Sequence, residues 1–230
     1  MTTGDPRATL ADALGALGET LRHHCDLGFT ELALKGDYLL GPAEALRAQE
    51  AALQGCRKCK LCEGRSTIVF GSGNPRAELV VIGEGPGADE DAQGLPFVGR
   101  AGQLLTKMLE SVQLSRDDVF VTNAVLCRPP GNRNPEADEL AACRPFLDAK
   151  LGVIQPKVIL ALGSVATQAL LRTKEAIGKL RGRMHPFGNA VLIPTFHPAF
   201  LLRNPGPEYR RMAWDDLKLA KREYENRRTR

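Results

Sequence analysis

The stretch Leu79-Val80-Val81-Ile82-Gly83-Glu84-Gly85-Pro86-Gly87 decides the fold of this 230-residue chain. Four apolar residues lead directly into a glycine-rich turn, which is typical of a buried strand that ends close to a helix. Three more apolar runs follow, at residues 119–122, 158–162 and 190–193. Helical patterns separate these runs. Strands that are apolar throughout need cover on both sides, so the pattern predicts an α/β protein with a mostly parallel sheet.

The helices that should cover the sheet fall between its strands and after the last one. They are expected at residues 101–112 and 135–151, from Ser164 as far as Leu171, and at 210–228. Asn134 stands where a helix cap would precede Pro135, a residue suited to the first helical position.

The first 50 residues are rich in alanine and leucine and differ from the rest of the chain. Leucines recur there at helical spacing, at Leu10, Leu14, Leu17 and Leu21. A second helix is expected around residues 45–53, with Pro42 near its first turn. We therefore predict a helical N-terminal extension over residues 1–50 and one main domain over residues 51–230.

The composition is that of a globular protein, with 43% hydrophobic and 25% charged residues. No run of about 18 apolar residues predicts a membrane span. The polar N-terminus carries no secretory signal, so we expect a cytoplasmic protein, whose thiols stay reduced. The net charge of +4 permits a polyanion as partner without requiring one. Aromatic residues make up only 5% of the chain, which argues against broad stacking surfaces for single-stranded nucleic acid.

Five cysteines gather in two segments, at Cys56, Cys59, Cys62, Cys127 and Cys143. Cys56 and Cys59 form a C-x-x-C motif, and Cys127 and Cys143 form a second pair. Two pairs in a cytosolic chain predict one four-thiolate site for zinc or for an iron–sulfur cluster. The spacing does not decide between these metals, and unconnected buried thiols are the alternative. Cys62 forms another C-x-x-C with Cys59, so the choice of ligands stays open on spacing alone.

The glycine-rich turn formally matches the dinucleotide fingerprint G-x-G-x-x-A, through Gly83, Gly85 and Ala88. Its surroundings argue against a pyrophosphate. Pro86 lacks a backbone donor, and four acidic residues stand nearby, at Glu84, Asp89, Glu90 and Asp91. A neutral polar ligand fits this loop better, and a simple strand-to-helix turn is the alternative.

Other strand ends also carry polar side chains. Asn123 follows the second apolar run, and His197 follows the fourth. Ligands of parallel sheets bind beyond the carboxyl ends of the strands, so we expect the site at that edge. After His197, the apolar residues 200–202 stand beside Arg203, a pattern that fits a wedge inserted into a DNA duplex. Basic residues at 172–183, with Arg128 and Arg133, are suited to follow a phosphate backbone.

These motifs together resemble the family 4 uracil-DNA glycosylases, the iron–sulfur type of bacteria and archaea. The resemblance covers about residues 50–205 and rests on several motifs in the same order. They are Gly83-Glu84-Gly85-Pro86-Gly87, Glu90-Asp91, Pro96-Phe97-Val98-Gly99, Thr122-Asn123, Cys127-Arg128-Pro129-Pro130, and His197-Pro198 with Leu201-Leu202-Arg203.

The resemblance implies a three-layer α/β/α sandwich around a four-stranded parallel sheet. It implies a [4Fe–4S] cluster held by Cys56, Cys59, Cys127 and Cys143, with Cys62 outside the ligand set. It also implies a uracil pocket built from Glu84, Gly85, Pro86, Glu90, Phe97, Asn123 and His197.

The chemistry of these side chains suits uracil. An Asn123 amide can accept from N3–H and donate to O4 at once, whereas cytosine presents the reverse pattern at C4. Phe97 would stack on the base, and Glu90 would crowd C5 and exclude the methyl group of thymine. A neutral His197 that donates to O2 would stabilise the uracil anion that leaves.

The closing motif predicts the contacts with DNA. Leu201, four residues after His197, is expected to fill the space left by the flipped nucleotide. Phe200 is the rival wedge, and Arg203 is expected to bind DNA.

Better-known uracil glycosylases carry an aspartate in the first loop, where this chain has Gly85. The sequence therefore identifies no general base, and Glu84 is the candidate for positioning the attacking water. Another subgroup traps DNA covalently through a glutamine in this loop and a basic insert, and this chain has neither. We predict a monomeric, monofunctional uracil-DNA glycosylase that acts on single- and double-stranded DNA and starts base-excision repair. The alternatives are a non-catalytic iron–sulfur or zinc DNA-binding module and a dinucleotide-dependent oxidoreductase.

Overall fold

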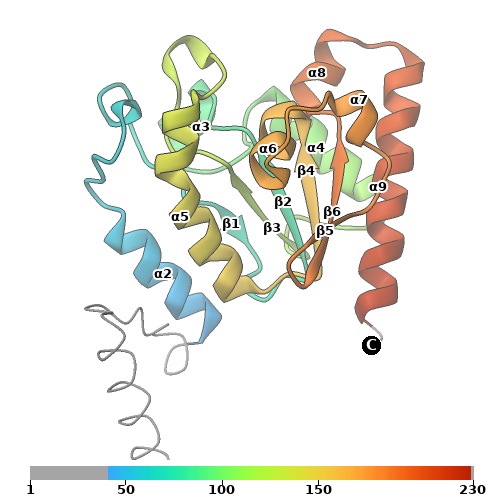
Figure 1. Ribbon diagram of the computed structural model, residues 1–230, viewed down its shortest axis with the longest axis horizontal. Coiled ribbons are helices and arrows are strands. Elements are labelled where there is room, and N and C mark those ends of the chain that lie inside the picture. The colour runs from blue at the N-terminus through green and yellow to red at the C-terminus, as the bar shows by residue number, and fades with distance from the viewer. Residues whose placement is uncertain (1–40, 229–230) are drawn as a thin grey trace, which may run out of the picture. The chain divides into compact units, whose positions relative to one another are not determined.

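The computed structural model describes residues 41–228, so the leucine pattern at residues 10–21 lies outside the described residues. A six-stranded sheet forms the centre, in the order β1-β3-β2-β4-β6-β5 (Figure 1). Its four inner strands are parallel and correspond to the four predicted ones: β2 (Leu79–Gly83), β3 (Val119–Asn123), β4 (Val158–Leu162) and β6 (Ala190–Thr195). The predicted α/β class and parallel core are therefore confirmed.

Two short strands at the edges were not predicted. β1 (Ser72–Gly73) pairs antiparallel with β3, and β5 (His185–Phe187) pairs antiparallel with β6. Two or three residues are too few to show an alternating pattern, and short edge strands limit unwanted pairing with other chains.

Helices cover both faces of the sheet (Figure 1). They are α2 (Pro42–Ala52), α3 (Ala88–Gln93), α4 (Arg100–Ser111), α5 (Ala137–Ile154), α6 (Gly163–Leu171), α7 (Ile177–Leu180), α8 (Pro198–Arg203) and α9 (Pro207–Arg228), with 3-10 turns η2 (Lys60–Cys62) and η3 (Pro130–Asn132). Val80 and Ile82 pack toward α2, α5 and α6, whereas Leu79 and Val81 pack toward α4 and α9. This alternation gives the three layers. Within residues 41–228, no helix is long and apolar enough to cross a membrane.

Leu46 and Leu53, at α2, lie in the same core cluster as residues of α5. The helix cap expected at Asn134 needs correction. Helix α5 begins at Ala137, two residues beyond the predicted start, with Glu136 in the cap position. The Glu139 carboxylate accepts from the Glu136 backbone N–H at 2.7 Å, so it satisfies the amide that Asn134 was expected to cap.

Candidate active site

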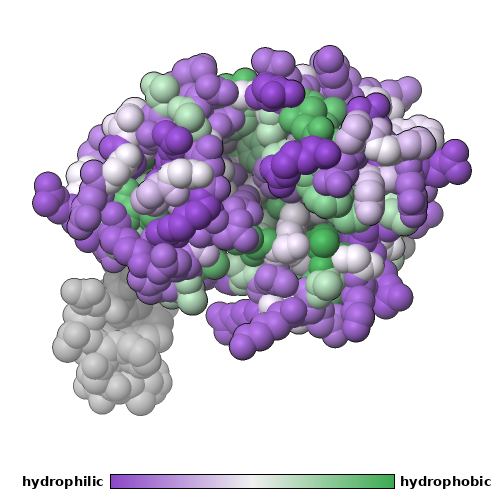
Figure 2. All heavy atoms as spheres, turned by 90° about the horizontal axis from the view of Figure 1, so that it is seen from above, coloured by the Kyte–Doolittle hydropathy of each residue, from purple (hydrophilic) through white to green (hydrophobic). Residues whose placement is uncertain are grey.

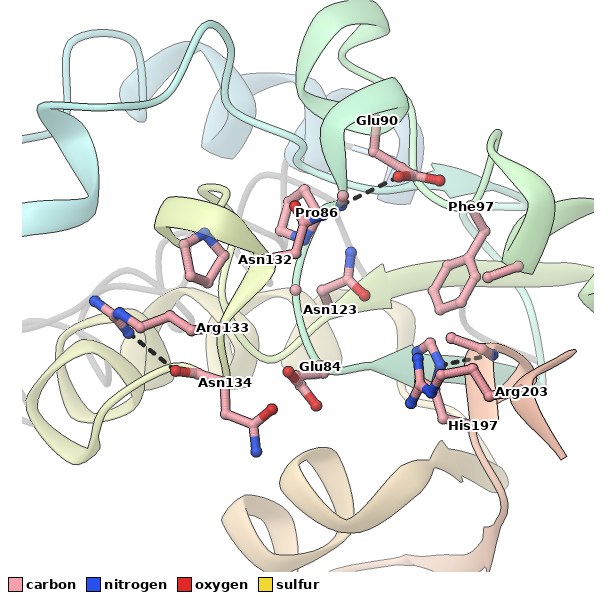
Figure 3. A pocket seen from close by; sticks show the side chains of 15 residues that line it. Glu84, Pro86, Glu90, Phe97, Asn123, Asn132, Arg133, Asn134, His197 and Arg203 are labelled. Atoms are coloured by element: carbon pink, nitrogen blue, oxygen red, sulfur yellow. Dashed lines mark hydrogen bonds between the residues drawn. The ribbon is translucent and has the colours of Figure 1, made fainter. Parts of the chain in front are cut away.

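A cavity of about 320 Å³ opens at the carboxyl ends of β2 and β3. The parallel register aligns Gly83 with Asn123, so the strand ends and the loops after them meet at one edge. Seen from above, this face is mostly hydrophilic and is hollowed near its middle (Figure 2). The lining includes every pocket residue expected from the sequence: Glu84, Gly85, Pro86, Glu90, Phe97, Asn123 and His197 (Figure 3).

Asn123 is buried at the bottom of this cavity, with 1% of its surface exposed. Its side-chain oxygen Oδ1 has no hydrogen-bond partner among the described residues. A buried acceptor without a donor costs about 1–3 kcal/mol, so such groups are rare in folded proteins unless a ligand supplies the donor. The cavity therefore carries an acceptor ready for an N–H of a bound molecule.

Phe97 forms one wall and holds an unusual backbone conformation, with φ of 56°. Its ring lies beside Gly83, where an added Cβ would come within 2.5 Å of the Phe97 ring and 2.4 Å of Asn123 Oδ1. The absence of a side chain at Gly83 thus lets the ring and the amide meet over the end of β2. The centroids of the Phe97 and His197 rings are 5.8 Å apart, and the two rings are tilted by 33°.

Glu90 fastens the two loops that form this side of the cavity. Its Oε2 accepts from the Gly87 N–H at 3.1 Å, and its Oε1 accepts from the N–H groups of Val98 and Gly99, each at 2.9 Å. These bonds hold the Phe97 loop against the glycine-rich turn. The Glu90 carboxylate thereby occupies the N-terminus of α3, where a phosphate would have to bind. This argues against the dinucleotide hypothesis.

His197 lies at the N-cap of α8 and faces Phe97 across the cavity (Figure 3). Its Nδ1 accepts from the Ala199 backbone N–H at 3.1 Å. Burial, followed by the positive charge of Arg203, lowers the pKa of His197 to about 4. The imidazole is therefore neutral at physiological pH. Because Nδ1 accepts, the neutral ring carries its proton on Nε2, for which the described part of the chain provides no hydrogen-bond partner.

Arg203 is the charged group that acts on both His197 and Glu84, and all three residues line the cavity (Figure 3). Glu84 is half-buried, and burial raises its pKa while the charge of Arg203 lowers it. The Glu84 carboxylate has no hydrogen-bond partner among residues 41–228. A carboxylate without a partner at the floor of the cavity is suited to hold a water molecule.

The profile of the Uracil DNA glycosylase superfamily matches residues 70–218. The chain is 46% identical over 168 residues to the Type-4 uracil-DNA glycosylase of Thermotoga maritima, covering 72% of this chain and 88% of that protein. It is 48% identical over 159 residues to the Type-4 enzyme of Saccharolobus solfataricus, covering 65% and 74%. This chain belongs to the type-4 uracil-DNA glycosylase family. Its identity to the Type-5 uracil-DNA glycosylase of Thermus thermophilus is lower, 34% over 178 residues, covering 67% and 79%.

In this type-4 glycosylase, helix α8 places its apolar residues differently from the prediction. Leu201, the expected wedge, is 3% exposed and packs against Phe196 and Ala213. Phe200, the rival, stacks on Phe196 with ring centroids 5.1 Å apart. Leu202 is 38% exposed and points away from this cluster. The helical turn directs Leu201 inward and leaves Leu202 as the exposed leucine of α8.

The basic residues singled out in the sequence are partly used inside the protein. Arg133 turns away from the cavity (Figure 3) and pairs with the buried Glu139 at 2.6 Å. Arg128 donates to Asn132 Oδ1 at 2.7 Å. Asn132 and Asn134 lie at the rim of the cavity and were not predicted from the sequence as site residues. The loop after β3 could have indicated them, because it contains two asparagines between prolines.

Four of the cysteines lie in or against one core cluster. Cys127 and Cys143 lie buried in the core, and Cys56 and Cys59 pack against it. Burial above all, together with the nearby sulfurs of Cys127, Cys59 and Cys56, raises the pKa of Cys143 to about 11. Four thiols thus share one neighbourhood, whereas Cys62 contributes to the raised pKa of Cys59 and not to that of Cys127 or Cys143.

Arg65 joins the two cysteine segments. Its guanidinium donates to the Cys127 sulfur at 3.3 Å and to the Cys56 backbone oxygen at 2.7 Å. Within residues 41–228, no three Cys, His, Asp or Glu side chains lie close enough together to bind a single metal ion. Soft thiolate donors of this kind suit zinc or an iron–sulfur cluster.

Proposed function

We propose that this chain is a monofunctional uracil-DNA glycosylase, which hydrolyses the N-glycosidic bond of deoxyuridine in DNA to start base-excision repair. The observation that carries the proposal is the buried, unpaired Oδ1 of Asn123 at the bottom of a cavity walled by Phe97. The Type-4 uracil-DNA glycosylases among its relatives support it by their names.

Asn123 would read the base. After the nucleotide flips out of the duplex, its Oδ1 accepts from uracil N3–H, and its amide N–H donates to O4. Cytosine offers an acceptor at N3 and a donor at C4, so both contacts would fail and leave buried polar groups unpaired. Phe97 stacks on the ring. Glu90, already fixed by three backbone N–H groups, would limit the space at uracil C5.

His197 would stabilise the leaving group. When the bond between C1′ and N1 breaks, its electron pair stays on uracil, and negative charge develops on O2. Nε2–H of the neutral His197 donates to that oxygen, and the sugar becomes an oxocarbenium-like cation. A water molecule then adds to C1′ and loses a proton, and Glu84 is suited to hold that water. Donors of this kind contribute about 3–4 kcal/mol in related chemistry.

Leu202 and Arg203 would make the contacts with DNA. Leu202 is exposed at the end of α8, where it can enter the space that the flipped nucleotide leaves. Arg203 lines the cavity and brings positive charge to its mouth, where it can meet a phosphate. Because one chain supplies the whole cavity, we propose that the enzyme works as a monomer on single- and double-stranded DNA.

We further propose that Cys56, Cys59, Cys127 and Cys143 hold a [4Fe–4S] cluster, with Cys62 outside the ligand set. The grouping of these four thiols in one part of the core supports this assignment. When bound, the cluster would supply structural cross-linking between the segment near Cys56 and the loop after β3. Free cysteines at all five described positions are consistent with a reducing, cytoplasmic setting.

The test is excision from oligonucleotides that carry one uracil, opposite G, opposite A, or in a single strand, followed by alkali. Strand breaks at uracil, with none at cytosine or thymine, are expected. Binding without breaks would favour the alternative, a non-catalytic DNA-binding module. The His197→Ala variant controls for a contaminating glycosylase, because breaks made by this chain must decline with it.

A further inference from the structure

The face formed by α4 and α9 carries a second cavity of about 300 Å³, which we call the α4–α9 groove. It shares no lining residue with the active site. The two helices pack against each other on one side of the sheet (Figure 1). The apolar lining consists of Leu104, Met108, Leu201, Ala213, Trp214 and Leu217.

Trp214 is the only tryptophan of the chain, and 47% of its surface is exposed. Exposed large aromatic residues beside an apolar hollow mark contact sites for other proteins, and tryptophan is enriched among the residues that dominate binding energy. The excision chemistry makes no use of this groove, so its exposed apolar surface needs another explanation.

Both charged side chains that line the groove are cationic. Lys107 and Arg210 line it, and no acidic residue does. Neither has an ion-pair partner within residues 41–228. The ammonium of Lys218 lies 4.1 Å from the centroid of the Trp214 ring. Lys218 also pairs with Asp215 at 2.7 Å and lines an adjoining polar cavity. That cavity contains the Arg181–Asp216 ion pair together with Arg183 and Arg222, which have no ion-pair partner among the described residues.

We propose that the α4–α9 groove binds an acidic peptide segment of another protein. A leucine or phenylalanine side chain of that segment would enter the groove beside Trp214. Flanking carboxylates would pair with Lys107 and Arg210, and further ones with the cations beyond Lys218. An apolar anchor in a hollow with complementary charge at its rim is the general pattern of such contacts.

Two other occupants fit the groove less well. Single-stranded DNA binds on rows of exposed aromatic faces, but here there is one aromatic ring, and Lys218 covers one of its faces. A second copy of this chain would bring the same patch against itself, since symmetric dimers use self-complementary surfaces. Lys107 and Arg210 would then face other cations, which is unfavourable.

The test starts from a library of short random peptides selected on the purified full-length protein. One enriched peptide is then titrated while the fluorescence of Trp214 is recorded. Enriched peptides should combine acidic residues with leucine or phenylalanine and should change the emission in a saturable way. The double variant Lys107→Glu/Arg210→Glu should weaken binding by at least about tenfold. Arg76→Glu, the same kind of charge reversal in an exposed turn outside the groove and the active site, should leave affinity unchanged, and both variants should excise uracil normally.

Several results would overturn the proposal. They are enrichment of neutral or basic peptides, enrichment of none that alters Trp214 emission, or equal affinity for the double variant. Saturable quenching by oligothymidine that the double variant abolishes would assign the groove to nucleic acid. Self-association in sedimentation experiments that Trp214→Ala removes would assign it to a second copy. Each readout is independent of uracil excision, so failure here does not affect the proposed function.

Discussion

The loop that follows β3 contributes residues to both the active site and the cysteine site, and the two sites differ in how far the protein alone completes them. In the active site, backbone N–H groups fix Glu90, and the Ala199 N–H fixes the tautomer of His197. In the cysteine site, burial raises the pKa of Cys143 to about 11, so the protein alone disfavours the thiolate. The pocket is thus preorganised for its ligand, whereas at the cysteine site the binding of a cation would offset the free-energy cost of forming thiolates.

The largest effect is expected for His197→Ala. Loss of one donor to the developing charge should lower the single-turnover rate by about 100- to 1,000-fold. Affinity for uracil-containing DNA and iron content should stay unchanged, because the residue lies away from the cysteines. His185→Ala, at a half-buried histidine of β5 whose ring contacts the Leu180 carbonyl at 2.9 Å, is the matched control. A comparable loss in that control would show that the fall in rate is not specific to His197.

A smaller effect is expected for Asn123→Asp. Replacing the amide donor to O4 by an acceptor leaves a buried contact unpaired and should lower uracil excision by about 10- to 100-fold. Excision of cytosine should rise relative to uracil, which oligonucleotides carrying either base will measure. Asn132→Asp makes the same change at the rim, where Oδ1 already accepts from Arg128, and should alter the rate little. A native rate in Asn123→Asp would remove Asn123 as the reader of the base.

Removing a cysteine of the cysteine site should lower the stability of the protein more than its rate of uracil excision. Cys127→Ala should lose bound iron, and a loss of about 2 kcal/mol would lower Tm by about 4–8 °C. Its single-turnover rate at low temperature should stay within a few-fold of the wild type, because the pocket is built without the cluster. Cys62→Ala should retain iron and Tm. If Cys127→Ala lost as much rate as His197→Ala while still folded, the two sites would not be independent.

The smallest effect is expected at the end of α8. Leu202→Ala should impair excision opposite A more than opposite G, and single-stranded uracil least, because unstacking costs most in a paired duplex. We expect a change of a few-fold in the ratio of single-strand to U:A rates. Leu201→Ala should lower Tm through a buried cavity and leave that ratio unchanged. The opposite pattern would restore Leu201 as the wedge.

Much of the fold and of the active site could be predicted from the sequence, because both depend on short continuous stretches of residues. The four inner strands were visible as apolar runs, and the pocket residues stood at their ends. The orientation of Leu201 was not predictable, because it depends on how α8 docks against Phe196 and Ala213. The fully buried Lys150 was also missed. It donates to Thr122 Oγ1 at 2.8 Å, and only the tertiary contact of α5 with β3 reveals it.

In the proposed mechanism, the pocket holds a neutral His197 with its proton on Nε2 before the substrate arrives. Nitrogen-15 NMR of histidine-labelled protein, with His197→Gln to assign the signal, tests it most directly between pH 5 and 8. Since the free imidazole titrates near pH 6.5 and burial lowers the pKa of His197 to about 4, the unfolded chain binds more protons between these values. The contribution of the neutral His197 to the stability of the fold is therefore lost as the pH falls from 6.5 towards 4. We predict an unprotonated Nδ1 and no titration of His197 across the range measured. A transition near pH 6.5 would contradict the account.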